Sequence, residues 1–199
     1  MALSRSRVGV LAVAVAALLT ACGGQEPDRG TQTGNTTTTS SAAGHNDQDV
    51  SFAQDMIPHH AQALGMAKMA PSRSTNPQVI DLAQRIEQAQ DPEIQQMRTW
   101  LEQWGADVPP ADEGDGGGHG GHDMPGMMKA EDMTALEKAT GPDFDRRWLD
   151  MMIEHHQGAV TMATAELAKG GDPEARKLAQ RIIDAQRAEI DEMTRLRQG

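Results

Sequence analysis

The segment MIPHHAQALGMA, at residues 56–67, returns 96 residues later as MIEHHQGAVTMA, at residues 152–163. A gapless shift of the sequence by this distance makes 18 of 50 aligned pairs identical, which is more than chance supplies. The matches fall into two blocks in each copy, one around the histidine pair and one around LAQRI at residues 82–86 and 178–182. Each copy therefore consists of two structural elements, and the chain carries this unit twice.

Apolar residues in both elements recur every three to four positions, which is the spacing of an amphipathic helix. Strand signals are weak, because the chain has no tyrosine and few β-branched runs. The helix starts are marked by Asn76-Pro77 and Asp172-Pro173, where a capping side chain precedes a proline at the first helical position. The pattern predicts long helices over 50–70, 77–104, 143–169 and 173–197, and a short one over 129–139.

Neither helical hairpin can bury its apolar stripe alone, so the two hairpins should stack on each other. We predict an all-α fold, a four-helix bundle of two duplicated hairpins related by an approximate two-fold axis. A glycine-rich crossover, residues 105–128, joins the hairpins and should be mobile. The predicted domain covers 49–199, with the first hairpin at 49–104 and the short helix and second hairpin at 129–199.

The N-terminus has the pattern of an export signal, with two arginines followed by a short apolar run over residues 8–19. This run ends in Leu-Thr-Ala-Cys22, which resembles the lipobox of bacterial lipoproteins, whose cysteine is acylated. We predict a signal peptide at 1–21, lipidation of Cys22, and a disordered polar tether at 22–48. The chain would then be exported and anchored in the cell membrane, facing the extracytoplasmic side. The alternative is an ordinary secretory signal with an incidental cysteine.

The histidine pairs straddle the inward stripe of their helices, and stacking the hairpins would bring up to four imidazoles and several thioethers toward one interior region. Imidazole suits copper, zinc and iron, whereas thioether sulfur favours copper(I). The alternative is that these side chains are core packing, for which methionine is well suited. Burial of four imidazoles without polar partners is costly, which favours a metal. We therefore predict a metal site, with copper(I) preferred and other transition metals as alternatives, at His59, His60, His155, His156, Met56, Met66, Met152 and Met162.

The crossover carries the same two ligand types on a flexible glycine-rich chain. It provides a possible second metal site, for which stray side chains in a polar linker are the equally open alternative. The candidate ligands are His119, His122, Met124, Met127 and Met128.

Several function classes are disfavoured. The net charge of −11 does not suit nucleic acid, which requires a basic face. A ferritin-type di-iron oxidase uses inward glutamates and Glu-x-x-His motifs, and Glu-x-x-His does not occur in the sequence. Ser/His/Asp, phosphate-loop and Cys/His motifs are also missing, so we do not expect an enzyme.

The repeated segments "F...MIPHHAQALGMA" and "FDRRWLDMMIEHHQGAVTMA" resemble the bacterial exported family of domain of unknown function 305. The likeness covers roughly Asp49 to Leu196. It implies a ferritin-like four-helix fold and, because some periplasmic relatives bind copper and take part in copper tolerance, a metal site at the matching histidines and methionines. The lipobox and the His/Met-bearing crossover depart from a plain family member.

Together these observations predict a lipid-anchored extracytoplasmic protein that binds copper and buffers it or hands it on. The main alternative is a non-catalytic interaction module that contacts an envelope protein, with the histidines and methionines as packing. A metal-dependent oxidoreductase is the weaker alternative.

Overall fold

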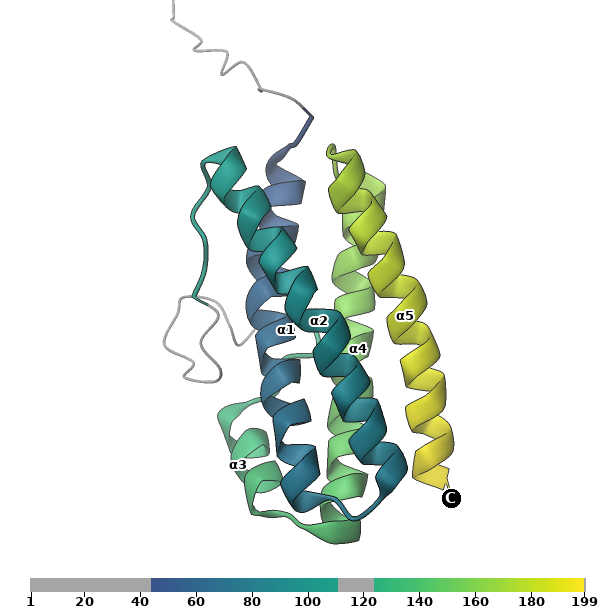
Figure 1. The fold of residues 1–199 in the computed structure, drawn as a ribbon. Coiled ribbons are helices and arrows are strands. Elements are labelled where there is room, and N and C mark those ends of the chain that lie inside the picture. The colour runs from purple at the N-terminus through teal and green to yellow at the C-terminus, as the bar shows by residue number, and fades with distance from the viewer. Residues whose placement is uncertain (1–43, 111–123, 199) are drawn as a thin grey trace, which may run out of the picture. The chain divides into compact units, whose positions relative to one another are not determined.

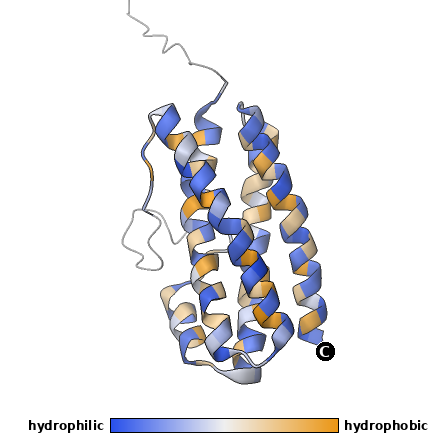
Figure 2. Ribbon diagram, in the orientation of Figure 1, coloured by the Kyte–Doolittle hydropathy of each residue, from blue (hydrophilic) through white to orange (hydrophobic). Residues whose placement is uncertain are grey.

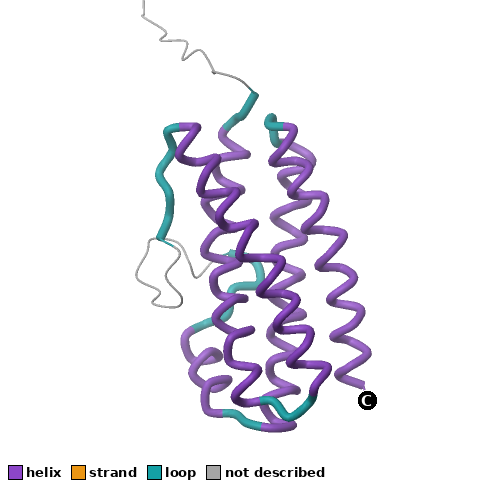
Figure 3. The backbone as a smooth tube through the Cα atoms, viewed as in Figure 1, coloured by secondary structure: helices purple, strands orange, loops and turns teal. Residues whose placement is uncertain are grey.

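Four long helices and one short helix make up the part of the chain that the computed structural model describes, residues 44–110 and 124–198 (Figure 1). No strand occurs within these two ranges (Figure 3). The predicted all-α fold and the duplicated hairpins are confirmed. The helices are α1 (Asp47–Arg73), α2 (Pro77–Trp104), α3 (Ala130–Lys138), α4 (Gly141–Lys169) and α5 (Pro173–Gln198).

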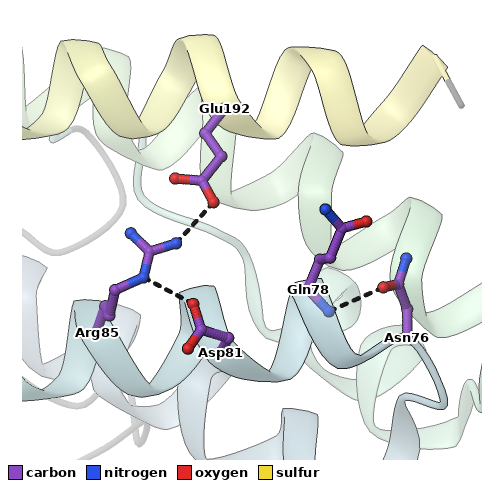
Figure 4. Close-up of polar contacts among 5 residues, drawn as sticks. All are labelled: Asn76, Gln78, Asp81, Arg85 and Glu192. Atoms are coloured by element: carbon purple, nitrogen blue, oxygen red, sulfur yellow. Dashed lines mark hydrogen bonds and ion pairs between the residues drawn. The ribbon is translucent and has the colours of Figure 1, made fainter.

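The helix ends follow the capping signals of the sequence. Asn76 accepts a hydrogen bond from the Gln78 amide, and Pro77 occupies the first position of α2 (Figure 4). Gly105 ends α2 in the left-handed conformation, with a φ of 68°.

Helix α1 begins earlier than residue 50 because of a capping box that the sequence pattern alone did not indicate. The Asn46 side chain accepts hydrogen bonds from the amides of Gln48 and Asp49, and the Asp49 carboxylate accepts one from the Asn46 amide. The ordered bundle therefore extends a few residues into the segment expected to be tether.

Each hairpin packs closely within itself, α1 against α2 and α4 against α5, and the two hairpins meet mainly through α1 and α4 (Figure 1). The start of α1 lies beside the end of α4, since the Asp49 carboxylate accepts hydrogen bonds from the amides of Gly171 and Asp172. The two central helices are therefore antiparallel. Each helix alternates hydrophilic and hydrophobic positions along its length, as expected for amphipathic packing (Figure 2).

The apolar core is divided into two clusters that the internal two-fold relationship exchanges. The Phe52 cluster includes Met56, Met97 and Ile182, and the Phe144 cluster includes Met152, Met193 and Ile86. Corresponding positions of the two copies thus fall at opposite ends of the bundle. In the second cluster the Trp148 indole donates a hydrogen bond to the Met66 carbonyl at 3.0 Å, which joins α4 to α1.

Two further observations concern the prolines inside the helices and the segment that precedes α1. Helices α1 and α2 continue through Pro58 and Pro92. Within the described ranges, none of the helices combines the length and the apolar character needed to cross a membrane. The predicted signal peptide, Cys22 and most of the tether lie outside the described residues.

Candidate metal centre

A layer of buried polar side chains lies between the two apolar clusters. On α2, α4 and α5 its residues fall in the sequence gap between the members of one cluster and those of the other. Most of these side chains are at least nine-tenths buried, and the two glutamates close the layer at its outer edge. We call this set the central polar layer; it consists of His59, His60, Gln90, Glu93, His155, His156, Gln186 and Glu189.

His59 and His155 meet at the centre of this layer. Their ring centroids are 3.7 Å apart with an interplanar angle of 36°, and neither side chain is exposed. Because the two residues occupy the same position in the two copies, they lie where the internal two-fold axis crosses the bundle. The prediction that stacking the hairpins brings histidines of both copies together is met for this pair.

The other two histidines turn toward the outer helices. The Nε2 atom of His60 lies 2.8 Å from Oε2 of Glu93 on α2, and Nε2 of His156 lies 2.8 Å from Oε2 of Glu189 on α5. These two contacts are equivalent under the duplication. Each fixes an imidazole ring against a carboxylate at the edge of the core.

The end of the crossover covers the central histidine pair. We call residues Met124–Met128 the strap. The Pro125 carbonyl accepts a hydrogen bond from Nε2 of His59 at 3.1 Å. The Gln62 side chain accepts one from the Met128 amide at 2.7 Å and donates one to the Met128 carbonyl at 2.9 Å. The strap is thus fixed to α1 at two points.

Two glycines allow the strap to approach α4. A Cβ atom added to Gly158 would lie 1.9 Å from the Pro125 carbonyl oxygen, and one added to Gly126 would lie 2.7 Å from the Glu154 carbonyl oxygen. Gly126 also has a φ of 79°, which side chains rarely adopt. The last residues of the crossover are therefore packed against the bundle, and the mobility expected for the crossover does not extend to them.

Burial keeps the central histidines neutral. Desolvation, assisted by the nearby His60 and His156, lowers the pKa of His59 to about 3, and the Pro125 hydrogen bond offsets this only in part. Desolvation, followed by the proximity of His59, also lowers the pKa of His155 well below its usual value. Neutral imidazole is the ligating form. His59 and His155 therefore remain in the ligating form below about pH 6, where an exposed histidine would be protonated.

Several polar atoms of the central polar layer have no hydrogen-bond partner within the protein. Such atoms are normally paired when buried, and leaving one unpaired costs roughly 1–3 kcal/mol. Their concentration in one layer indicates a candidate binding site for a polar ligand or a metal ion. They are both ring nitrogens of His155, Nδ1 of His59, His60 and His156, both amide atoms of Gln90, and Oε1 of Gln186.

The predicted methionine ligands flank this layer on both sides. Met56 and Met162 belong to or pack against the Phe52 cluster, whereas Met66 and Met152 belong to the Phe144 cluster. Each side therefore receives one methionine from each copy. The methionines lie within the apolar clusters and the four imidazoles lie in the layer between them.

The four histidines do not form a preorganised tetrahedral site. In the described parts of the chain, no three His, Cys, Asp or Glu side chains converge on a common metal position. The His59–His155 pair supplies ring nitrogens of both copies, and the neighbouring methionines supply thioethers. This donor set fits a soft ion such as copper(I) better than zinc, which takes four ligands.

The possible second site is divided between described and undescribed residues. His119 and His122 lie outside the described residues. Met124 and Met127 are half-buried in the strap, and Met128 packs into the Phe144 cluster. All three methionines belong to the strap, whose Pro125 carbonyl contacts His59 of the central polar layer.

Four residues of the layer are not among the metal ligands predicted from the sequence. Glu93, Glu189, Gln90 and Gln186 all lie in the second helix of each hairpin. A signal for them existed, because both positions are identical in the two copies and lie just beyond the LAQRI block. The contact of Glu93 and Glu189 with the histidines depends on the tertiary structure.

The fold and the buried histidines define a duplicated all-α four-helix bundle with a polar layer at its centre. A family model described as a domain of unknown function, DUF305, matches residues 49–197, and the chain belongs to this family. No curated protein matches the chain.

Three solved structures show the likeness. A DUF305 protein from Streptomyces coelicolor, described as secreted, is 31% identical with a TM-score of 0.66, over 75% of this chain and 91% of its own. A DUF305 fragment from Deinococcus radiodurans is 34% identical with a TM-score of 0.66, over 77% and 97%. CopM in its Cu(II)-bound form is 39% identical with a TM-score of 0.64, over 75% and 95%. CopM has also been solved with Cu(I) and with silver.

Proposed function

We propose that this protein is an exported, lipid-anchored copper-binding protein that holds copper in the core of its bundle and buffers it or hands it on. The observation that carries the proposal is the contact of His59 with His155, at 3.7 Å between ring centroids, in a layer rich in unpaired ring nitrogens. Without a bound ligand, burial of these polar groups would only lower the stability of the protein.

The chemistry of the surroundings supports copper(I). Burial lowers the pKa of His59 and of His155 and keeps both imidazoles neutral, and thioethers from both copies lie on either side of the layer. CopM, to which this chain is similar, has been solved with copper and with silver, and silver(I) has the same soft character as copper(I). We propose binding and not catalysis, since the layer contains ligands and orienting groups and the sequence has no catalytic motif.

The test is a copper(I) titration of the full chain against a competing chelator. The double variant His59→Ala/His155→Ala should lose the tightest site and lose the rise in melting temperature that copper gives the unchanged protein. His45→Ala is the control, because His45 stacks on Trp104 at the end of the bundle. An unchanged affinity in the double variant would show that copper binds elsewhere.

The methionines are tested by replacements that keep their volume. Met56→Leu and Met66→Leu should alter the free energy of unfolding by less than about 1.5 kcal/mol. If the thioethers bind copper(I), the affinity should fall although stability is retained. An affinity equal to that of the unchanged protein would make both methionines packing residues only.

The proposed anchor has its own test. Cys22→Ser should move the protein from the membrane fraction to the soluble extracytoplasmic fraction, because acylation requires the thiol. A chain that is equally membrane-bound after the substitution would not be held by a lipid on Cys22.

A further inference from the structure

The contacts of His60 and His156 determine which ring nitrogen carries the proton. Each Nε2 atom lies 2.8 Å from a glutamate oxygen, while the imidazoles are fully buried and the glutamate side chains of Glu93 and Glu189 are 20% and 14% exposed. An ionised carboxylate only accepts hydrogen bonds. Nε2 is therefore the protonated nitrogen of both rings.

The opposite nitrogen of each ring is left with its lone pair. Nδ1 of His60 and of His156 is buried and has no hydrogen-bond partner within the protein. A proton at this position would be a buried donor without an acceptor, which is unfavourable. His59 follows the same rule, because the Pro125 carbonyl occupies its Nε2 and leaves Nδ1 unpaired.

We propose, on the basis of the copper function above, that Glu93 and Glu189 are positioning residues of the metal centre that present Nδ1 of His60 and His156 as the metal-binding atoms. A carboxylate that accepts the far N–H of a ligating histidine fixes its tautomer, orients the ring and increases the basicity of the ligating nitrogen.

The duplication supports this assignment. The same glutamate position meets the same histidine nitrogen in both hairpins, at the same distance. Pro92 before Glu93 is replaced by Ala188 before Glu189, so the contact persists although the local backbone chemistry differs.

The direct test is long-range ¹H–¹⁵N spectroscopy of the ¹⁵N-labelled full chain, without metal and with silver(I) as the diamagnetic probe. We expect His60 and His156 to show the Nε2–H tautomer before silver is added, and silver to shift their Nδ1 resonances. Silver-dependent shifts at Nε2, with loss of the glutamate contact, would overturn the positioning role alone. No binding of silver or copper(I) by the unchanged chain would overturn the copper function and this role with it.

Variants separate positioning from folding. Glu93→Gln and Glu189→Gln keep the side-chain shape, but an amide can donate as well as accept, so it no longer dictates the tautomer. We expect mixed tautomers in the metal-free protein and a silver affinity about 10–100-fold lower in the double variant, with little change in melting temperature. Glu87→Gln, a half-buried carboxylate on the same helix α2, is the control and should change neither. Retention of the single tautomer and of full affinity in the double variant would overturn the proposal.

Discussion

The central polar layer and the two apolar clusters beside it are built on different principles. The Phe52 and Phe144 clusters are close-packed and apolar, and they exchange under the internal two-fold relationship. The layer between them buries imidazoles and amides, several of whose polar atoms have no partner within the protein. Apolar side chains there would make a bundle of this size more stable, so the layer lowers stability where the clusters raise it, which agrees with the proposed copper site.

The layer also departs from the symmetry that the clusters keep. Gln62 and Gly158 occupy the same position of the two copies, two residues after the second histidine. Gln62 holds the Met128 backbone, whereas Gly158 makes room for Pro125. The same crossover packs against both positions but contacts them differently. Its Pro125 carbonyl accepts a hydrogen bond from His59, whereas both ring nitrogens of His155 stay unpaired. The two central histidines are therefore inequivalent.

The largest effect is expected where the strap covers the layer. Gly158→Ala should lower the free energy of unfolding by about 2–3 kcal/mol, because its Cβ would lie 1.9 Å from the Pro125 carbonyl oxygen and backbone must move. Urea unfolding of the full chain measures this. Gly65→Ala is the matched control in α1: it meets open space and should stabilise the helix by about 0.5–1 kcal/mol. Equal stability of the two variants would mean that the strap does not pack tightly on α4.

Replacing unpaired amides should have the opposite sign. Gln90→Leu/Gln186→Leu should raise the free energy of unfolding of the metal-free protein by about 1–3 kcal/mol, because both amides are buried and have polar atoms without a protein partner. Denaturant unfolding measures the gain, and the exposed Gln88→Leu serves as the control with a change below about 0.5 kcal/mol. A loss of stability would show that the layer is satisfied in solution and would remove the contrast with the clusters.

A buried carboxyl outside the layer should give the protein a distinct pH dependence. Burial, and next the neighbouring Asp49 carboxylate, raise the pKa of Glu166 to about 8 from 4.5. Its folded form holds the proton more tightly, so its stabilising contribution is complete below pH 4.5 and is lost as the pH rises to about 8. Glu166→Gln should remove this decline, and its melting temperature should exceed that of the unchanged protein at pH 9. Parallel pH profiles of the two proteins would contradict the assignment.

His59, at the centre of the layer, acts in the opposite direction. With a pKa of about 3 in the folded state against 6.5, His59 contributes stability that is present above pH 6.5 and is lost as the pH falls toward 3. The two contributions together should make the unchanged protein most stable between about pH 4.5 and pH 6.5, because the fall of the His59 contribution at lower pH and the fall of the Glu166 contribution at higher pH offset each other within this range.

The smallest effect is expected at the surface, away from both regions. Arg85 on α2 donates hydrogen bonds to Glu192 on α5 at 2.6 Å and to Asp81 at 2.9 Å (Figure 4). These hydrogen bonds raise the pKa of Arg85, and the one to Glu192 has the larger effect. The Arg85 and Glu192 side chains are 43% and 32% exposed. Glu192→Gln should lower the free energy of unfolding by no more than about 0.5 kcal/mol, and 1 M salt should abolish the difference. A larger, salt-independent loss would give this ion pair a structural role comparable with that of the core.

The sequence alone determined the helices and their pairing. The repeat, the 3.6-residue period and the Asn-Pro and Asp-Pro starts depend on local chemistry. They therefore predict the first and last residues of the four long helices to within a few positions. The start of α1 differs from the predicted residue 50 because its capping box depends on the reciprocal hydrogen bonds of Asn46 and Asp49. The repeat also indicates which histidines correspond. In the structure one such pair, His59 and His155, is in contact.

Only the tertiary structure decided how the four histidines differ. Sequence spacing treats the two members of each pair alike, because both lie near the inward stripe of one helix. Packing sends His60 and His156 to carboxylates on the outer helices, leaves His59 and His155 in contact, and lays one strap across them. These choices depend on contacts between residues that are 33 to 96 positions apart, and no local pattern of side chains specifies them.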